Sequence, residues 1–306
     1  MVNTVYSVNI TARNTHIIPF DFEYYEPRSL DEALELLSKY REQAKILAGG
    51  TDLLVKMKTR LVEPRVVINI KKIPGLRYIV EEGNYVKIGA LTTLRDIERS
   101  GIIQKHTPAL HDAVKLMGSI QVRNMATLVG NLCNASPAAD TAPPLLVHNA
   151  RVVALSKRGR RVIPLEEFFK GPGLTTLEPD EIVVEVLIEK ATRGSSAFSK
   201  ISRVAVDLAI ASAAVQAEID VNGVVESAKI AVGSVAPRPL RLKLLEEKIR
   251  NLRVGSSELK EVLGVIDSEI SPITDVRSTA EYRRHVVKVL VWDTLERVYR
   301  RIRRGV

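Results

Sequence analysis

Cysteine is almost absent from this chain of 306 residues, and that scarcity excludes several kinds of site. Cys133 is the one thiol, so the chain forms no internal disulfide, no cysteine-rich zinc site and no iron–sulfur cluster of its own. The five histidines lack the short spacings of metal-binding motifs. His106 and His111 fall near one predicted helix, but without further ligands we expect no metal there.

Long apolar runs are also missing. No stretch approaches the roughly 18 consecutive apolar residues of a membrane span. The first 20 residues have no basic segment followed by an apolar run, so they do not resemble a secretory signal. We therefore expect a cytoplasmic protein with no transmembrane segment.

The net charge of +9 is concentrated near the C-terminus. Residues 283–304 hold eight basic and two acidic side chains, and their apolar residues follow helical spacing. A basic helix can bind phosphate, but aromatic residues are few here and no nucleic-acid motif is present. We interpret the segment as an amphipathic helix whose charges face solvent or a partner protein, and we expect no nucleic acid.

The first half of the chain predicts alternating helices and strands. Ser29 and Glu32 match a helix-capping box, and Thr107-Pro108 is typical of a helix start. Further elements are expected as a strand at 45–48, a helix at 53–59, a strand at 66–70, hairpins at 78–88 and 151–164, and a helix at 108–117.

The pattern changes after Gly171-Pro172-Gly173. Strand-like segments follow at 182–188, 197–203 and 208–219, and Asn222-Gly223 predicts a type I′ hairpin turn. Helices are expected after residue 240. A domain boundary is therefore predicted between about 175 and 190.

Two segments rich in small residues are candidates for ligand binding. Ile46–Leu53 is a strand that enters a Gly-Gly turn and then a helix, and glycine lets the backbone approach a pyrophosphate closely. A purely structural strand-to-helix turn has the same sequence pattern. Ala126–Asp140 is poor in charge and rich in Asn, Ser and Thr, which suits a large polyhydroxylated cofactor. Neither a P-loop nor a Rossmann motif is present.

Together, AGGTD at 48–52 and TLVGNLCNASPAAD at 127–140 resemble the FAD-binding medium subunit of the molybdenum hydroxylases. This family includes xanthine dehydrogenase, aldehyde oxidoreductase and aerobic carbon monoxide dehydrogenase. Other segments agree in order and spacing over residues 20–300: IGALTT at 88–93, QVRN at 121–124, AFSK at 197–200, and DVR at 275–277 with AEYR at 280–283.

The resemblance implies an α+β fold with a two-subdomain FAD-binding domain of the PCMH type. It implies a C-terminal domain of carbon monoxide dehydrogenase flavoprotein type, with a three-stranded antiparallel sheet and helices. We expect an N-terminal arm at 1–20, the FAD-binding domain at 21–185 and the C-terminal domain at 186–306. The two subdomains would cover about 21–72 and 73–185.

The resemblance also implies the cofactor-binding residues, and it implies neither a metal ligand nor a catalytic acid, base or nucleophile. Backbone donors of the first segment would hold the diphosphate. In the second segment, residues up to Asn131 would close on the diphosphate and residues from Ala135 on would meet the ribityl and adenosine parts. Four other residues would lie near the flavin ring or enter from the C-terminal region. In order, the cofactor-binding residues are Ile46, Leu47, Ala48, Gly49, Gly50, Thr51, Asp52 and Leu53; Ala126, Thr127, Gly130, Asn131, Ala135, Ser136, Ala139 and Asp140; and Gly118, Val122, Val183 and Lys200.

Several of these residues have a plain structural alternative. Lys200 could stabilise the reduced flavin or be a surface lysine, and Asp140 could bind a cofactor hydroxyl or cap a helix near Pro143. Cys133 is expected to be a small buried thiol, and Arg123 to meet phosphate or a partner's acidic patch. Val129 stands where the family often has glycine, so the hypothesis requires ordinary β backbone angles there.

The family resemblance implies an oxidoreductase that is incomplete alone. A large molybdenum-cofactor subunit and a small [2Fe-2S] subunit would join it in a dimer of heterotrimers, a heterohexamer. Electrons would pass through the clusters to one FAD on this chain and on to an external acceptor. Two alternatives are a stand-alone PCMH-fold flavin oxidoreductase and a non-enzymatic basic binding protein.

Overall fold

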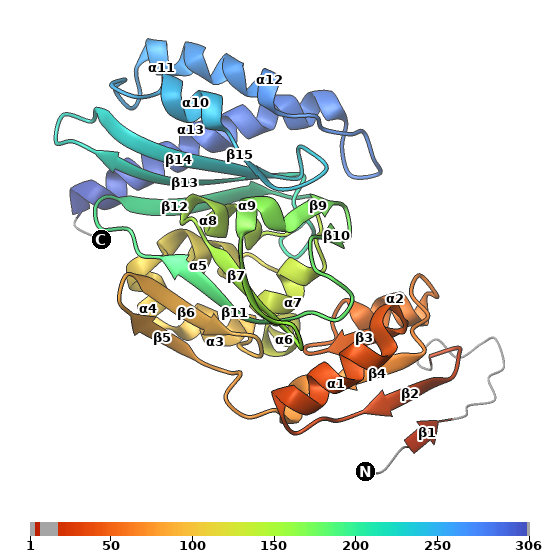
Figure 1. Ribbon diagram of the computed structural model, residues 1–306. Coiled ribbons are helices and arrows are strands. Elements are labelled where there is room, and N and C mark those ends of the chain that lie inside the picture. The colour runs from red at the N-terminus through yellow and green to blue at the C-terminus, as the bar shows by residue number, and fades with distance from the viewer. Residues whose placement is uncertain (1–3, 7–17, 305–306) are drawn as a thin grey trace.

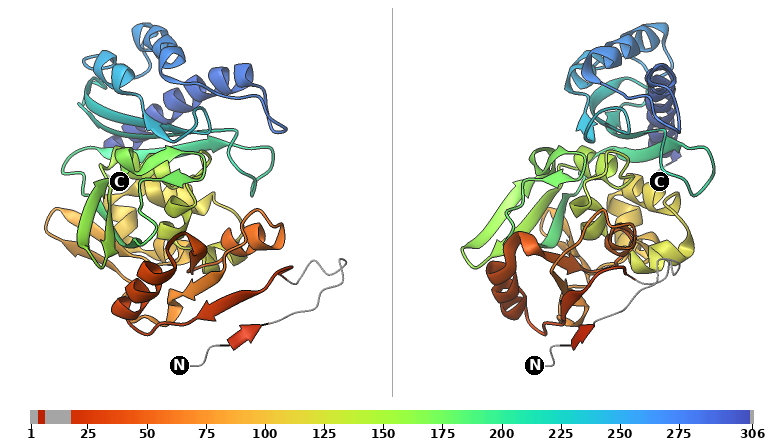
Figure 2. Two further views of the ribbon diagram at one scale, coloured as in Figure 1. Left: turned by 45° about the vertical axis from the view of Figure 1, so that its right-hand side comes forward. Right: turned by 90° about the vertical axis from the view of Figure 1, so that its right-hand side faces the viewer.

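The structure is a computed structural model that describes residues 4–6 and 18–304. Three layered parts follow one another along the chain, each with its own β-sheet (Figure 1). The two N-terminal parts meet at a shared cleft, and the C-terminal part lies against the second (Figure 2). This arrangement determines which residues can line a common site.

The first part is a four-stranded sheet in the order β1-β2-β4-β3. Ser29 caps the start of helix α1, because its hydroxyl accepts a hydrogen bond from the Glu32 backbone N–H. The Glu32 carboxylate accepts from the Arg28 backbone, so the predicted box forms one residue out of register. The elements are β1 (Thr4–Tyr6), β2 (Phe22–Tyr25), α1 (Leu30–Tyr40), β3 (Ala44–Leu47), α2 (Leu53–Lys58) and β4 (Val66–Asn69).

The second part is an antiparallel sheet in the order β5-β6-β11-β7-β8, covered by short helices. Its strands are β5 (Ile79–Glu82), β6 (Tyr85–Gly89), β7 (Arg151–Ser156), β8 (Gly159–Pro164) and β11 (Ile182–Glu189), beside the small pair β9 (Phe169–Gly171) and β10 (Leu174–Thr175). Its helices are α3 (Leu94–Arg99), α4 (Gly101–His106), α5 (Pro108–Lys115), α6 (Ile120–Met125), α7 (Leu128–Cys133), α8 (Ala142–Val147) and α9 (Leu165–Phe168).

The C-terminal part is a sheet in the order β12-β13-β14-β15 packed against helices. Three long strands were expected, and a fourth of two residues, β15, extends the sheet. The elements are β12 (Ser195–Ile201), β13 (Ala211–Ile219), β14 (Val225–Gly233), β15 (Leu240–Arg241), α10 (Lys243–Lys248), α11 (Ser257–Val262), α12 (Ile266–Glu269) and α13 (Ala280–Arg304).

Two predicted boundaries differ from the structure. The segment 1–20 was expected to be an arm separate from the first domain, but Thr4–Tyr6 pairs with β2 of that domain, while residues 1–3 and 7–17 lie outside the described part. A division at residue 185 cuts through β11, which pairs with both β6 and β7. The change from one sheet to the next falls between Glu189 and Ser195.

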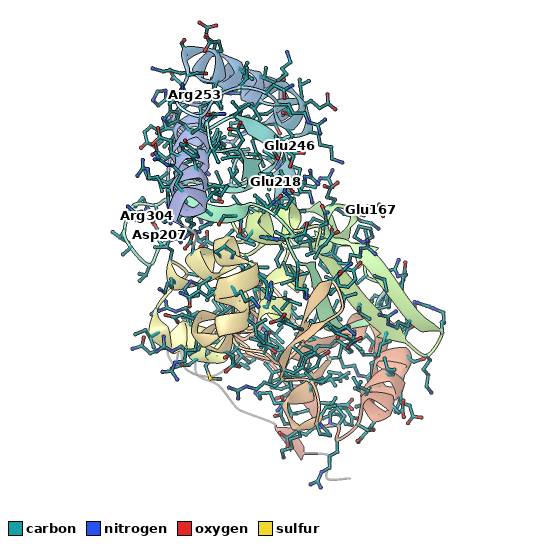
Figure 3. The ribbon with its side chains drawn as sticks, turned by 90° about the vertical axis from the view of Figure 1, so that its left-hand side faces the viewer. Glu167, Asp207, Glu218, Glu246, Arg253 and Arg304 are labelled. Atoms are coloured by element: carbon teal, nitrogen blue, oxygen red, sulfur yellow. The ribbon has the colours of Figure 1, made fainter. Side chains whose placement is uncertain are left out.

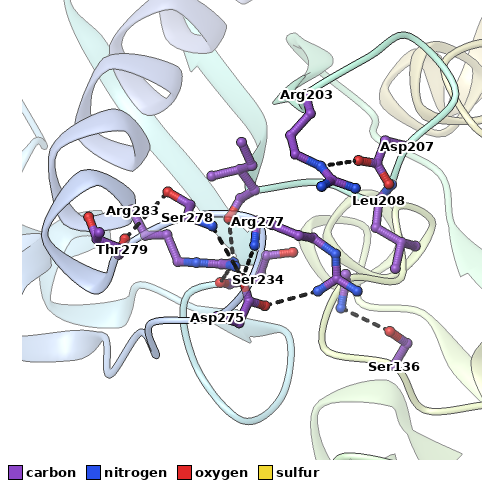
Figure 4. A network of polar contacts seen from close by, with 12 residues as sticks. Ser136, Arg203, Asp207, Leu208, Ser234, Asp275, Arg277, Ser278, Thr279 and Arg283 are labelled. Carbon is purple, nitrogen blue, oxygen red and sulfur yellow. Dashed lines mark hydrogen bonds and ion pairs between the residues drawn. The ribbon is translucent and has the colours of Figure 1, made fainter.

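Helix α13 only partly fits the solvated helix expected from its charge. Arg304, at the end of this helix, is exposed (Figure 3). Arg283, by contrast, is buried and donates to the carbonyl oxygens of Ile210 and Ser234, as Figure 4 shows. One residue of this basic segment is therefore buried, because the backbone carbonyl groups around it need hydrogen-bond donors.

Candidate functional site

The two small-residue segments meet directly at one cleft. A Cβ atom on Gly49 would lie 2.2 Å from the Met125 carbonyl oxygen, so only glycine permits this approach. On the other side of the contact, Asn134 donates to Asp52 at 3.0 Å and accepts from the Lys56 ammonium at 2.5 Å. Segments separated by about 80 positions are thus joined through backbone contact and a polar bridge.

The cleft has a volume of about 840 Å³ and extends between the first two parts of the molecule. That volume lies within the roughly 300–1,000 Å³ of small-molecule and cofactor sites. Arg41 and Lys45 line it from the first part of the molecule, and Val206 and Leu208 line it from the C-terminal part. A ligand that fills the cleft can therefore contact all three parts.

The second segment contains a helix where a loop was expected. Helix α7 runs from Leu128 to Cys133, and the Thr127 hydroxyl caps it by accepting from the Gly130 backbone at 3.0 Å. Val129 lies inside this helix, so the prediction of β backbone angles is wrong. It nevertheless avoids a positive φ, which is what the side chain of valine requires.

The segment at 88–93 supports this helix from behind. Leu94 donates to the Ala126 carbonyl at 2.8 Å, and Leu128 donates to the Thr92 carbonyl at 3.3 Å. The buried Thr92 hydroxyl donates in turn to the Tyr78 carbonyl at 2.8 Å. These bonds fix the start of α7 against the second sheet.

The Gly-Gly turn presents backbone donors to the cleft. Gly50 has a φ of +76°, and it lines the cleft together with Thr51 and Asp52. None of these three backbone N–H groups donates to another residue in the part of the chain that the structure describes. Successive N–H groups of this kind form a concave surface suited to an anionic ligand.

Asp140 and Lys200 form a buried ion pair at the wall of the cleft. The Lys200 ammonium lies 2.7 Å from Asp140 Oδ2, and the two side chains are 4% and 5% exposed. Lys200 is therefore not a surface lysine, and Asp140 is not a helix cap, because Thr141 precedes α8 without a side-chain cap. Burial raises the pKa of Asp140, an effect that Lys200 opposes. Asp140 Oδ1 is buried and has no partner among the described residues.

Two further residues differ in part from expectation. Arg123 is buried, pairs with Glu98 at 2.9 Å and donates to the carbonyls of Met117 and Gly118, so it meets neither phosphate nor a surface patch. Cys133 is partly accessible at the cleft, while its surroundings desolvate the thiol and raise its pKa to about 12. The thiol is thus protonated at neutral pH.

Of the 20 predicted cofactor residues, 16 line this cleft. The remaining four, Leu47, Gly49, Ala135 and Lys200, lie behind its surface. Leu47 and Ala135 are buried, and Gly49 packs on Met125. The predicted set is therefore brought together in space.

Sequence reasoning missed two groups of residues that line the cleft. The first is Arg41 and Lys45 with residues 177–179 and 181–182, and the second is Val206, Asp207 and Leu208. The second group follows closely after the AFSK segment at 197–200, which resembles the family, so that segment could have pointed to it. No such pattern marks residues 177–182.

No group of three or more potential metal ligands occurs within residues 4–6 and 18–304. In that same part of the chain, no helix combines the length and hydropathy needed to cross a membrane. His106 instead pairs with Glu81 at 3.0 Å.

Two family models match the chain. The FAD binding domain in molybdopterin dehydrogenase matches residues 20–190, and the CO dehydrogenase flavoprotein C-terminal domain matches residues 196–298. The junction between the two matches coincides with the change of sheets after β11.

Curated relatives and a solved structure agree with these models. The chain is 36% identical to the carbon monoxide dehydrogenase medium chain of Hydrogenophaga pseudoflava, covering 93% of this chain and 99% of that one. It is 33% identical to the glyceraldehyde dehydrogenase medium chain of Sulfolobus acidocaldarius, covering 92% and 99%. A structure of the Hydrogenophaga enzyme matches with a TM-score of 0.89 at 34% identity, covering 93% and 99%. The chain therefore belongs to the FAD-binding medium subunits of the molybdenum hydroxylases.

Proposed function

We propose that the cleft holds one FAD, with its diphosphate against the turn at Gly50–Asp52 and helix α7 on the opposite side. The main support is that three backbone donors and one buried acceptor, Asp140 Oδ1, have no partner among the described residues and belong to a single cleft. A diphosphate needs donors and a sugar or ribityl hydroxyl needs an acceptor, so the residues fit both parts of a dinucleotide.

The chain's own residues bind and orient the cofactor in this proposal. A bound flavin exchanges electrons singly or in pairs, and so connects iron–sulfur centres with a two-electron acceptor. The raised pKa of Cys133 keeps its thiol protonated, so it is not a nucleophile at neutral pH.

We further propose that the chain works beside a large molybdenum-cofactor subunit and a small [2Fe-2S] subunit, as a dimer of heterotrimers in the cytoplasm. The relatives support this arrangement because their names describe medium chains and FAD subunits of larger enzymes. Those names also refer to different substrates, including glyceraldehyde, nicotinate and carbon monoxide. We therefore assign substrate choice to the partner.

The cofactor assignment is tested by blocking the cleft. Ala138 lines the cleft and is partly exposed, and Ala191 is equally partly exposed but lies outside it. We expect Ala138→Glu to weaken FAD binding at least tenfold, about 1.4 kcal/mol, by adding bulk and negative charge. Ala191→Glu should bind like the wild type. The measurement is a fluorescence titration with FAD, and equal affinities in the two variants would contradict the assignment.

The subunit role needs a separate experiment. An affinity-tagged chain purified from its native cells should bring down two further polypeptides, one with molybdenum and one with iron. The isolated chain should show flavin absorption but no turnover of an aldehyde, purine or carbon monoxide with an artificial dye. Turnover by the isolated chain would instead indicate a stand-alone flavoenzyme.

A further inference from the structure

The loop at 202–209, between β12 and β13, borders the cleft. Val206, Asp207 and Leu208 line the cleft, although they belong to the C-terminal part of the molecule. In Figure 2 the loop projects from that part on the same side as α2. Val206 and Leu208 are 60% and 45% exposed, so little apolar burial stabilises the loop.

Most hydrogen bonds of this loop are internal. Asp207 accepts from Arg203 Nε at 2.7 Å through Oδ2, and from the Leu208 backbone at 2.8 Å through Oδ1 (Figure 4). The Asp207 backbone donates to the Val204 carbonyl at 3.1 Å. These bonds define the shape of the loop but do not attach it to the wall of the cleft.

Lys200 makes that attachment. Its ammonium donates to the Asp207 carbonyl at 3.3 Å and to Asp140 Oδ2 at 2.7 Å. Among the described residues, no other side chain forms hydrogen bonds with both the loop and Asp140. Because the ammonium is shared in this way, its charge is largely neutralised by Asp140, which argues against a role as a free positive charge beside the flavin.

The other oxygen of Asp140, Oδ1, has no hydrogen-bond partner within the part of the chain that the structure describes. If a cofactor hydroxyl donates to Oδ1, the carboxylate becomes fixed from both sides, and Lys200 with it. We propose that Lys200 is a positioning residue that couples occupancy of the cleft by FAD to the ordering of the 202–209 loop. This inference rests on the proposed function. Because coupling is reciprocal, an ordered loop would also strengthen cofactor binding by the same factor.

Limited proteolysis of the full chain tests the coupling. Arg203 has a 53% exposed side chain, so trypsin can cut the Arg203–Val204 bond when the loop opens. We expect saturating FAD to slow this cut about tenfold in the wild type, within the 5- to 150-fold range typical of coupled sites. The cut after Arg193, whose side chain is 67% exposed in a different loop, should be unaffected and serves as the internal control.

Variants of Lys200 separate coupling from simple stability. Lys200→Met should still take up FAD, as shown by its visible spectrum, but it should lose most of the protection at Arg203 and bind FAD more weakly by about the same factor. Lys200→Arg, which keeps a charge and several donors, should restore it. Unchanged protection in folded Lys200→Met would overturn the proposal. If Lys200→Met fails to fold, Lys200→Gln replaces it, since its single amide group can donate but carries no charge to pair with Asp140.

Wild-type results distinguish this proposal from the function on which it rests. Bound FAD with no protection at Arg203 overturns the coupling and leaves the FAD site standing. Absence of FAD binding overturns both. Hydrogen exchange of the backbone amides of Val204–Leu208 gives an independent measurement, and FAD should slow it in the wild type but not in the Lys200→Met or Lys200→Gln chain.

Discussion

The cleft wall and the domain junction are built by different physical means. The cleft wall, which we define as residues 46–53 with 126–140, relies on backbone contact, small residues and short capped helices. The domain junction, where α5 and α8 meet β12 and α13, relies on buried polar side chains and on partly buried charged ones. A wall that binds a ligand must leave some hydrogen-bond donors free for that ligand. At a permanent junction, every donor can instead bond to another group of the protein.

The largest expected effect concerns the closest backbone contact of the cleft wall. Gly49→Ala would place a Cβ 2.2 Å from the Met125 carbonyl, so the two segments must separate. We expect a loss of stability of about 3 kcal/mol or more, with loss of FAD binding, because overpacking against backbone cannot relax cheaply. Thermal unfolding and FAD titration measure the two effects.

Gly101→Ala is the matched control for that variant. A Cβ at Gly101, at the start of α4, meets no atom within 4 Å, and φ there is not positive. Alanine favours helix, so this substitution should be neutral or slightly stabilising. If both variants behave alike, the close approach of the two segments does not hold the cleft together.

His148 sharpens the comparison from the side of the domain junction. Its Nε2 lies 3.0 Å from Ser196 Oγ, which accepts from the Ala109 backbone at 3.1 Å. Burial lowers the pKa of His148 from 6.5 to about 4, so the folded protein holds the neutral ring. The unfolded chain binds the proton first, and stability present above pH 6.5 is lost as the pH falls towards 4.

Protonation of His148 in the unfolded chain is expected to lower the free energy of unfolding by about 3 kcal/mol at pH 4. His148→Gln cannot titrate, so its free energy of unfolding should change less between pH 7 and pH 4 than that of the wild type. Denaturant unfolding at the two pH values measures this difference. A parallel loss in both proteins would show that carboxylates alone cause the acid sensitivity.

Much of the cleft wall was predictable from sequence because its signals are local. Gly49-Gly50 marked the turn of the wall. Outside the wall, the helix start at Thr107-Pro108 was also placed correctly, although the Thr107 hydroxyl donates to the Ile103 carbonyl instead of capping the helix. Helix α7 was missed because Gly130 and Asn131 are poor helix formers. Asn222-Gly223 did mark a hairpin, but Asp220 closes a longer turn there by accepting from the backbones of Asn222 and Val224.

The domain junction was not predictable from a single sequence. Asp112 and Arg301 are 189 positions apart, and Asp140 and Lys200 are 60 apart. Charge patterns within a helix identify neighbours three or four residues away, but no local rule pairs residues at such distances. The basic residues of α13 were therefore expected to face solvent or a partner protein, whereas Arg297 and Arg301 pair with Asp112 at the junction.

Asp112 tests how much those charges contribute. Its carboxylate lies 3.2 Å from Arg297 and 2.8 Å from Arg301, linking α5 to α13. Asp112→Asn should lower stability by about 2 kcal/mol, less than a fully buried pair because Arg297 is 39% exposed. Glu296→Gln, which removes an exposed pair with Arg300, should cost less than about 0.5 kcal/mol. Equal effects in thermal unfolding would remove the distinction between junction and surface charges.

The smallest expected effect is a gain of stability at the rim of the cleft. Arg41 ends helix α1 with a φ of 44° and a ψ of −122°, a conformation that glycine adopts more easily than arginine. Its contact with Asp180 is loose at 3.9 Å, so little is lost with the side chain. Arg41→Gly should raise stability by about 1 kcal/mol, measured by thermal unfolding, by removing backbone strain.

Arg41→Ala separates the backbone from the side chain, because alanine keeps the strain and loses the same contacts. We expect no gain from alanine, and an equal gain would mean that the arginine side chain itself is unfavourable. Arg41 also lines the cleft, so FAD affinity should be measured for both variants. A loss of affinity shared by glycine and alanine would place the guanidinium in contact with the cofactor. A rim that is then more stable yet binds FAD more weakly would show that the backbone strain at Arg41 is kept for ligand binding.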